Sequence, residues 1–307
     1  MTWFERNTHH WGEWTVEELA AAKGATRVSL VVPARNEAAT VGDLVTRVRA
    51  ALMDTVALVD EIVVIDSDST DATAQVAADA GAAVFASAAI RPDLGSHPGK
   101  GEAMWKSLFV TTGDVLVFMD ADLVEWDTHF VPGLLGPLLT RPAVELVKGF
   151  YERPGETGPL DGGRVTELVA RPLISLLHPE LSGLVQPLAG EWAVRRSLFA
   201  SLPVPTGYAV ELAALVDTLS ARGLDAIAQV DLGTRGHRHQ DLLDLGVMAT
   251  QIMAAMQRRG LDKLDQRAPQ GQDAVSLRQF RPVDDRIEPV ERSVLVAERP
   301  PAEGCSS

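Results

Sequence analysis

The segment Thr26–Leu52, TRVSLVVPARNEAATVGDLVTRVRAAL, joins a strand pattern to a helix pattern. Val28–Val32 is a continuous apolar run, which is typical of a strand buried on both faces, and Pro33 is expected to end it. From Glu37 onward the apolar residues recur at helical spacing, at Val41, Leu44, Val45, Val48 and Leu52. The segment therefore predicts a strand, a polar turn and a helix, which is the repeating unit of an α/β protein.

The same order recurs further along the chain. EIVVIDSDSTDAT (61–73) predicts a second strand with a polar turn and a helix, and AAVFAS (82–87) predicts a short third strand. KGEAMWKSLFVTTG (100–113) has helical spacing, whereas GDVLVFMDADL (113–123) and ELVKGFY (145–151) read as strands. Strands that alternate with helices predict an α/β fold with a mostly parallel sheet.

The second half has longer helical patterns. GGRVTELVARPLISLLHPEL (162–181) predicts a helix broken by Pro172, and GYAVELAALVDTLSARGL (207–224) predicts an amphipathic helix that ends at Gly223. QPLAGEWAVRR (186–196) alternates as a strand does. After about residue 270 Arg, Asp, Glu and Pro dominate, so an irregular tail is predicted there, either partly disordered or wrapped over a neighbour.

Composition excludes several classes of protein. The 307 residues are 46% hydrophobic, enough for a large core, and they contain no apolar run long enough to predict a membrane span. The net charge of −14 argues against nonspecific nucleic-acid binding through a basic surface. A single cysteine, Cys305, excludes a disulfide framework and favours a cytoplasmic protein.

Polar clusters follow several predicted strands, which is where open α/β sheets bind their ligands. In FMDADL (118–123), Asp120 and Asp122 are two residues apart, so on a strand both carboxylates point to the same side. Together they could reach one divalent cation and the diphosphate that it neutralises. The alternative is that strand ends simply carry polar residues, and for PARNE and DSDSTD the alternative is ordinary turn and capping chemistry.

Three further motifs carry candidate anion or metal ligands. Lys100 stands between two glycines ahead of a predicted helix and suits a phosphate oxygen, although a solvated lysine fits equally well. DGGRVTEL places Gly163, Arg164 and Thr166 at the start of a predicted helix, where they could bind an anion. The alternative is a flexible loop with a capping residue. In GTRGHRHQ, His237 could join Asp122 on a metal, and Arg235 or Arg238 could contact a phosphate, whereas an ordinary surface histidine is the alternative.

Taken in order, VVPARNE, IDSDSTDAT, PGKGEAMW and DADL resemble the nucleotide-sugar-binding half of GT-A glycosyltransferases. The later motifs GGRVTELVARPL, QPLAGEWAVRR, GYAVELAALVD, GLDAIAQVDLG and HRH resemble glucosyl-3-phosphoglycerate synthases of actinobacteria and their mannosyl relatives. The resemblance extends over roughly residues 10–260. It implies a GT-A fold: a Rossmann-like, mostly parallel sheet flanked by helices, followed by a C-terminal acceptor-binding part.

The resemblance also implies a division of the chain and a reaction. The implied parts are an N-terminal extension (1–24), a nucleotide-sugar-binding half (25–150), an acceptor-binding and metal-completing half (151–265) and the irregular tail (266–307). The implied reaction moves a hexose, in the first place glucose, from a nucleoside diphosphate sugar to D-3-phosphoglycerate with retention at the anomeric carbon. Magnesium or manganese and a homodimer are implied as well, with UDP-glucose, GDP-glucose and GDP-mannose all open as donors.

Site residues follow from the same resemblance. The implied donor-binding residues are Pro33, Ala34, Arg35, Glu37, Ser67, Lys100, Asp120 and Ala121. The implied metal ligands are Asp122 and His237, and the implied acceptor-binding residues are Gly163, Arg164 and Thr166. The implied catalytic residues are Glu211, Asp122 and Lys100. With no convincing nucleophile in the sequence, we expect front-face attack by the acceptor hydroxyl, with Glu211 orienting the sugar.

Some residues depart from the family pattern. Arg35 and Ala121 stand near the donor in place of an apolar residue and a serine, His239 replaces an asparagine, and Asp161 replaces a glycine in the acceptor loop. These departures leave the donor and the acceptor open. A sugar nucleotidyltransferase would share the nucleotide pocket, and a non-catalytic nucleotide-sugar-binding regulator is a third reading.

Overall fold

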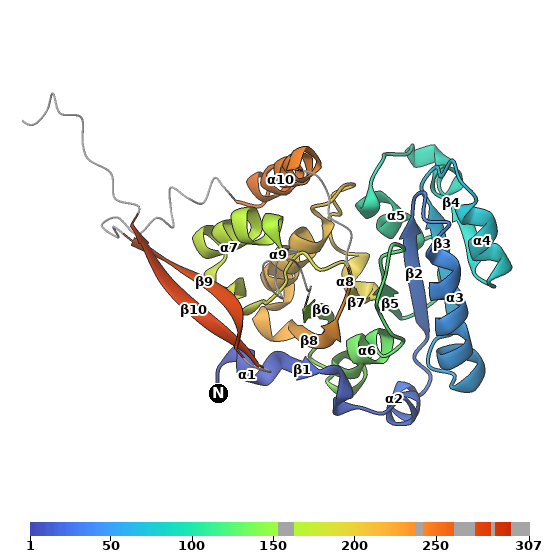
Figure 1. The fold of residues 1–307 in the computed structure, drawn as a ribbon, viewed down its shortest axis with the longest axis horizontal. Coiled ribbons are helices and arrows are strands. Elements are labelled where there is room, and N and C mark those ends of the chain that lie inside the picture. Colours follow the sequence, from blue (N-terminus) through green and yellow to red (C-terminus); the bar gives the residue numbers. More distant parts are fainter. Residues whose placement is uncertain (153–162, 237–241, 261–273, 284–285, 296–307) are drawn as a thin grey trace, which may run out of the picture.

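The computed structural model describes residues 1–152, 163–236, 242–260, 274–283 and 286–295 (Figure 1). Its centre is an eight-stranded sheet with the strand order β1-β8-β6-β7-β5-β2-β3-β4. The pairs of β7 with β5 and β6 are antiparallel, and all other neighbours in this sheet are parallel. The strands are β1 (Thr8–His10), β2 (Val28–Ala34), β3 (Glu61–Asp66), β4 (Ala83–Ala86), β5 (Val115–Phe118), β6 (Leu146–Glu152), β7 (Trp192–Arg195) and β8 (Ile227–Thr234). The expected mostly parallel sheet is confirmed.

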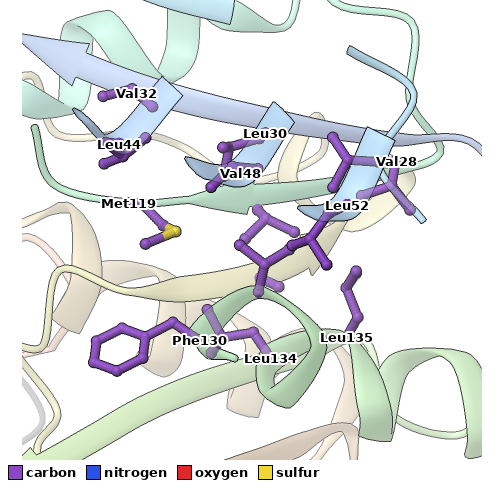
Figure 2. Close-up of a cluster of buried hydrophobic side chains, with 14 of the residues drawn as sticks. Val28, Leu30, Val32, Leu44, Val48, Leu52, Met119, Phe130, Leu134 and Leu135 are labelled. Carbon is purple, nitrogen blue, oxygen red and sulfur yellow. The ribbon is translucent and has the colours of Figure 1, made fainter. Parts of the chain in front are cut away.

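Helices cover both faces of this sheet, which explains why its strands read as continuous apolar runs. One face packs against α2 (Val16–Lys23), α3 (Val41–Arg49), α4 (Thr73–Asp79) and α6 (Phe130–Thr140). Figure 2 shows part of this layer, where Val28, Leu30 and Val32 meet Leu44, Val48 and Leu52. The other face packs against α5 (Lys100–Ser107), α7 (Arg171–Leu177), α8 (Arg196–Phe199), α9 (Val210–Arg222) and α10 (Leu242–Gln257).

Two strand and helix boundaries differ from the sequence prediction. β2 continues through Pro33 to Ala34, because β5 pairs with β2 only as far as Val31 and a proline is tolerated where a strand has one neighbour. The predicted helix with a break at Pro172 is a π-helix, η5 (Thr166–Ala170), which continues directly into α7. Pro172 lies in the first turn of α7, where its missing N–H would have no helical partner.

The N-terminal residues are not an appendage to the fold. After α1 (Trp3–Asn7), strand β1 adds to the edge of the sheet by pairing parallel with β8, from Thr8 opposite Gln229 to His10 opposite Asp231. The expected N-terminal extension therefore contributes a strand to the central sheet. That sheet also takes strands from both predicted halves, and the boundary at residue 150 stays a prediction.

The expectation of an irregular tail is wrong for two segments. Strands β9 (Ala274–Val283) and β10 (Arg286–Leu295) form an antiparallel hairpin, which Figure 1 shows along the outside of the molecule beside α7. The charged composition suggested disorder, but Arg278 and Glu291 form an ion pair across the hairpin. Prolines are tolerated here because both strands of a two-stranded ribbon are edges.

Within the described ranges, no helix is both long enough and apolar enough to cross a membrane.

Candidate active site

A cavity of about 380 Å³ opens at the carboxyl ends of β2, β3, β5 and β8. Every described residue that the sequence assigned to the site lines it: Pro33, Ala34, Arg35, Glu37, Ser67, Lys100, Asp120, Ala121, Asp122, Gly163, Arg164, Thr166 and Glu211. Of the candidate site residues named from the sequence, Asp161, His237, Arg238 and His239 lie outside the described residues. The fold thus brings the assigned residues into one cavity, and the roles assigned to them stay predictions.

The polar loops after β2 and β3 are hydrogen-bonded to each other. The Glu37 backbone N–H donates to Thr73 Oγ1 at 2.8 Å, and the Thr70 backbone N–H donates to Asn36 Oδ1 at 2.8 Å. The alternative interpretation, that polar residues in these loops make ordinary turn and capping hydrogen bonds, is therefore correct for Asn36, Thr70 and Thr73. Glu37 and Ser67 line the cavity from these two loops, which the two hydrogen bonds hold together.

Lys100 is fixed by close backbone packing at the start of α5. A Cβ at Gly99 would lie 2.4 Å from the Thr206 carbonyl oxygen, and one at Gly101 would lie 1.9 Å from that of Pro205. The two glycines therefore allow α5 to approach the segment that leads into α9. This approach places Lys100 Nζ 2.8 Å from Glu211 Oε1, in the first turn of α9.

The Lys100 ammonium bridges two carboxylates. It lies 2.5 Å from Asp120 Oδ1 as well as beside Glu211, whose side chain is 5% exposed. Burial lowers the pKa of Lys100, but the charges of Asp120 and Glu211 outweigh it and raise the pKa above its ordinary value. Lys100 is therefore a fixed positive charge at the floor of the cavity.

Asp120 and Asp122 lie beyond the end of β5, which stops at Phe118. The argument that both carboxylates share one side of a strand is therefore wrong, and they are brought together by a turn instead. Phe118 pairs with Trp192 on antiparallel β7, so the next residues place Asp120 near Gly190. A Cβ at Gly190 would lie 2.1 Å from Asp120 Oδ2, so only a glycine leaves room for this carboxylate.

Arg235 binds both aspartates from the end of β8. Its Nη2 lies 3.1 Å from Asp122 Oδ1 and 3.4 Å from Asp120 Oδ2, and its Nη1 lies 3.1 Å from Glu191 Oε1. Tyr151 joins the same network, because its hydroxyl donates to Glu191 Oε2 at 2.7 Å and accepts from Arg235 Nη1 at 2.6 Å. Burial alone would lower the pKa of Arg235, but these partners raise it well above its ordinary value. The cavity floor thus carries a second permanent cation.

Lys148 lies beneath this network, in the middle of β6. Its ammonium is buried, donates to the Ala189 carbonyl and lies 5.7 Å from the centre of the Trp192 ring. Burial lowers the pKa of Lys148 to about 7, although Glu211, Glu191 and Asp120 act in the opposite direction. Ala189 directly precedes the glycine that faces Asp120, so Lys148 holds the segment that shapes the aspartate site.

Sequence reasoning missed several of these residues. Glu191, Tyr151 and Lys148 were read only as parts of strands, and Arg235 was considered for phosphate without a place in the site. The available signal was a charged residue inside an apolar strand pattern, as Lys148 is in ELVKGFY. Charged residues are almost never fully buried unless they are paired, so such a residue predicts a buried network.

Gly163, Arg164 and Thr166 line the same cavity as the residues at the strand ends. They occupy the turn that enters η5, where the Glu167 backbone N–H donates to the Gly163 carbonyl at 2.8 Å. Backbone N–H groups at a helix start, a guanidinium and a hydroxyl form a combination that suits an anion.

Comparisons with known proteins agree with this geometry. The sequence pattern of Glycosyl transferase family 2 matches residues 29–198. A curated glucosyl-3-phosphoglycerate synthase from Mycolicibacterium smegmatis is 47% identical over 300 residues, which cover 95% of either chain. This chain belongs to the glucosyl-3-phosphoglycerate synthase family of glycosyltransferases.

Solved structures of the family agree in fold. A Mycobacterium tuberculosis glucosyl-3-phosphoglycerate synthase in complex with Mn2+, UDP-glucose and phosphoglyceric acid matches with a TM-score of 0.76 and 42% identity, over 97% of this chain and 98% of that one. The same enzyme in complex with Mg2+ and UDP matches with a TM-score of 0.76, 43% identity and the same coverage. The α/β architecture is therefore of the GT-A type, and the chain is a glycosyltransferase rather than a sugar nucleotidyltransferase or a non-catalytic regulator.

Proposed function

We propose that this chain transfers glucose from UDP-glucose to D-3-phosphoglycerate, giving glucosyl-3-phosphoglycerate. The observation that carries the proposal is the single cavity, which holds the nucleotide loops, the aspartate pair, two buried cations and the anion-binding turn. Relatives named glucosyl-3-phosphoglycerate synthase over nearly the whole chain support this substrate pair.

The donor would bind between the loops after β2 and β3 and the aspartates after β5. Pro33, Ala34, Arg35 and Glu37 would hold the nucleoside together with Ser67, because they form the rim of the cavity at that end. Asp120 and Ala121 would lie next to the ribose and the diphosphate.

The divalent cation would bind at Asp122, although no group of three or more candidate ligand side chains lies together in the part of the chain that the structure describes. This carboxylate lines the cavity with its side chain 41% exposed, and carboxylate oxygens are ligands that Mg2+ and Mn2+ prefer. Asp122 and His237 would hold the ion, with His237 outside the described residues. When bound, such an ion neutralises charge on the departing diphosphate.

The residues of the chain perform the remaining tasks. Bond breaking leaves a nucleoside diphosphate, whose growing negative charge is stabilised by the permanently charged Lys100 and Arg235. The bond between the anomeric carbon and the donor phosphate oxygen breaks as the acceptor hydroxyl adds to the same carbon. The acceptor proton passes to the departing phosphate oxygen. No protonating side chain is needed, in contrast to glycosidases.

Retention at the anomeric carbon is proposed from the family resemblance, and among the described residues that line the cavity the carboxylates nearest the expected sugar position are paired with a cation. Lys100 Nζ lies 2.8 Å from Glu211 Oε1 and 2.5 Å from Asp120 Oδ1, so both carboxylates are paired with the same cation. We therefore propose attack from the same face that the diphosphate leaves, with Glu211 orienting the sugar. NMR of the product formed from UDP-α-glucose tests this step: an α-glucoside supports it and a β-glucoside contradicts it.

The acceptor would bind at Gly163, Arg164 and Thr166. This turn lines the same cavity as the donor loops, and its hydrogen-bond donors match the phosphate of D-3-phosphoglycerate. The negative charge of the acceptor thus meets a positive group although the chain as a whole carries −14.

A donor panel tests the substrate choice. UDP-glucose, GDP-glucose and GDP-mannose are each supplied with D-3-phosphoglycerate and Mn2+, and kcat/KM is measured for each pair. We expect the highest value with UDP-glucose. A higher kcat/KM with GDP-mannose would show that this chain shares the donor of the mannosyl relatives. It would point to Arg35 and Ala121 as the residues that changed the donor.

We also propose that the enzyme is a cytoplasmic homodimer. The single cysteine allows no disulfide within the chain, as is typical of reducing compartments. The hairpin β9–β10 supports the dimer, because β10 has no further strand neighbour among the described residues and so offers an edge with which a second copy could pair. Light scattering would give twice the chain mass of 32.9 kDa for a dimer.

A further inference from the structure

The C-terminal hairpin is connected to the turn that lines the acceptor end of the cavity. Gln279 Nε2, on β9, donates to Glu167 Oε2 at 2.8 Å. The Glu167 backbone N–H in turn donates to the Gly163 carbonyl at 2.8 Å. Two hydrogen bonds therefore lead from the hairpin to Gly163, whereas the two residues are more than one hundred positions apart in the sequence.

Arg171 anchors the same carboxylate from a second side. Its Nε donates to Glu167 Oε1, and its two other nitrogens donate to the carbonyls of Leu184 and Val185. Its guanidinium lies 5.0 Å from the centre of the Phe280 ring, next to Gln279 on the hairpin. Glu167 is thus held between one partner on α7 and one partner on β9.

Phe280 fixes the hairpin in place. It is 7% exposed, stacks on Phe4 with 5.7 Å between ring centres and packs with Phe150 and Val185. A small cavity of about 30 Å³ is lined by Phe280 together with Gly163 and Thr166. The hairpin and the cavity-lining turn therefore enclose a common space, and a movement of one changes the surroundings of the other.

The segment held in this way is a π-helix, η5, which begins at Thr166. Such helices are rare, short and common at functional sites, and they depend on their surroundings for support. The carboxylate of Glu167 is the side chain through which η5 receives that support from both α7 and β9.

We propose that Gln279 is a positioning residue for acceptor binding, acting through Glu167 on the Gly163–Thr166 turn. This inference rests on the proposed function only in naming the ligand, a phosphorylated acceptor. The loss of the Gln279 hydrogen bond should weaken acceptor binding and leave donor binding unchanged, because the donor loops follow β2 and β3, which lie on the other side of the molecule from α7 and the hairpin in Figure 1.

The test compares Gln279→Glu with Ser276→Ala. The first substitution keeps the size of the side chain but removes the N–H donor and places a second carboxylate against Glu167. The control removes the hydrogen bond of 2.8 Å from Ser276 to Glu291, which lies within the same hairpin and does not reach Glu167. We expect the KM for D-3-phosphoglycerate to rise about five- to tenfold in Gln279→Glu, with less than a twofold change in the KM for UDP-glucose and none in the control.

A second readout does not depend on turnover. Hydrogen exchange of the amides in residues 163–170 should be faster in Gln279→Glu than in wild type or in Ser276→Ala. Unchanged exchange in this segment, or equal changes in the KM values of donor and acceptor, would overturn the inference. A wild-type enzyme that does not act on D-3-phosphoglycerate would contradict the proposed function alone, and the exchange comparison would still decide the role of Gln279.

Discussion

Arg235 Nη2 lies 3.1 Å from Asp122 Oδ1, so the carboxylate proposed to bind the divalent cation already has a positive neighbour. Bringing a cation to this site costs repulsion from the guanidinium, and the full charge of the carboxylate offsets that cost. The negative charge of Asp122 is therefore essential for cation binding, because without it Arg235 would make the site positive.

The substitution Asp122→Asn should lower kcat/KM about 100-fold or more and raise the Mn2+ concentration needed for half-maximal activity, because the amide keeps the shape and loses the charge. Asp127→Asn is the matched control, since Asp127 follows in the same region but pairs with Arg47 at 2.8 Å and lies outside the cavity. Wild-type kinetics and Mn2+ dependence in Asp122→Asn would refute its role at the cation.

Replacing Gly190 by alanine should disable the site without unfolding the protein. The new Cβ would meet the Asp120 carboxylate at 2.1 Å and displace it from Lys100. We expect kcat/KM to fall about 100-fold, since a shift of about 1 Å in a reacting geometry costs that much. Gly246→Ala is the control, because it lies in α10 with nothing within 4 Å of the new Cβ. That control should keep full activity and gain up to about 1 kcal/mol in unfolding free energy, and equal losses in both variants would contradict the argument.

Glu211→Ala should lower kcat about ten- to a hundredfold, because it removes one of the two carboxylates that fix Lys100 and the group proposed to orient the sugar. The KM for UDP-glucose should change much less, since the nucleoside is held at the other end. Glu145→Ala removes a carboxylate that pairs with Arg222 at 3.1 Å away from the cavity, and it should have wild-type kinetics. Wild-type turnover in Glu211→Ala would show that Glu211 has no part in the reaction.

Lys148 makes stability depend on pH. Its pKa of about 7 in the folded protein is below the ordinary 10.5, so between these values the unfolded chain binds a proton that the folded chain does not. The unfolding free energy therefore rises with pH in this window, by up to about 1.4 kcal/mol per pH unit from this group. Below pH 7 both states are protonated and the full cost of burying the charge is present.

The substitution Lys148→Met should remove that rise. Urea unfolding at pH 7, 8 and 9 measures the slope for both proteins, and the unfolding free energy of wild type should rise with pH relative to that of Lys148→Met. Parallel curves for Lys148→Met and wild type across this range would contradict a lowered pKa for Lys148.

The parts of the fold that repeat were predictable from sequence. The run Val28–Val32, apolar except for Ser29, reflects a strand buried on both faces, and the spacing from Val41 to Leu52 reflects a helix that packs one face on the sheet. The site residues after β2, β3 and β5 were found because strand ends meet at one edge. Pro33 was misread because its tolerance depends on how far β5 extends, which no local pattern contains.

The residues that sequence could not place act through distant partners. Gly190 matters only because antiparallel β7 brings it against Asp120, seventy positions earlier. The hairpin β9–β10 has a composition typical of disorder, and its stability comes from cross-strand pairs and from Phe280 on Phe4. Such contacts are fixed by topology and register, which the sequence specifies only through the whole fold.

Product formation from UDP-glucose and D-3-phosphoglycerate, with Mn2+ and then with a chelator, tests the proposed reaction most directly. Mass spectrometry follows the hexosyl phosphoglycerate, and a second assay follows the release of UDP in equal amount. The proposed reaction predicts that both products form with Mn2+, stop on chelation and return when Mn2+ is added in excess. Tight UDP-glucose binding without any transfer, or transfer that continues at the same rate with the chelator, would contradict it.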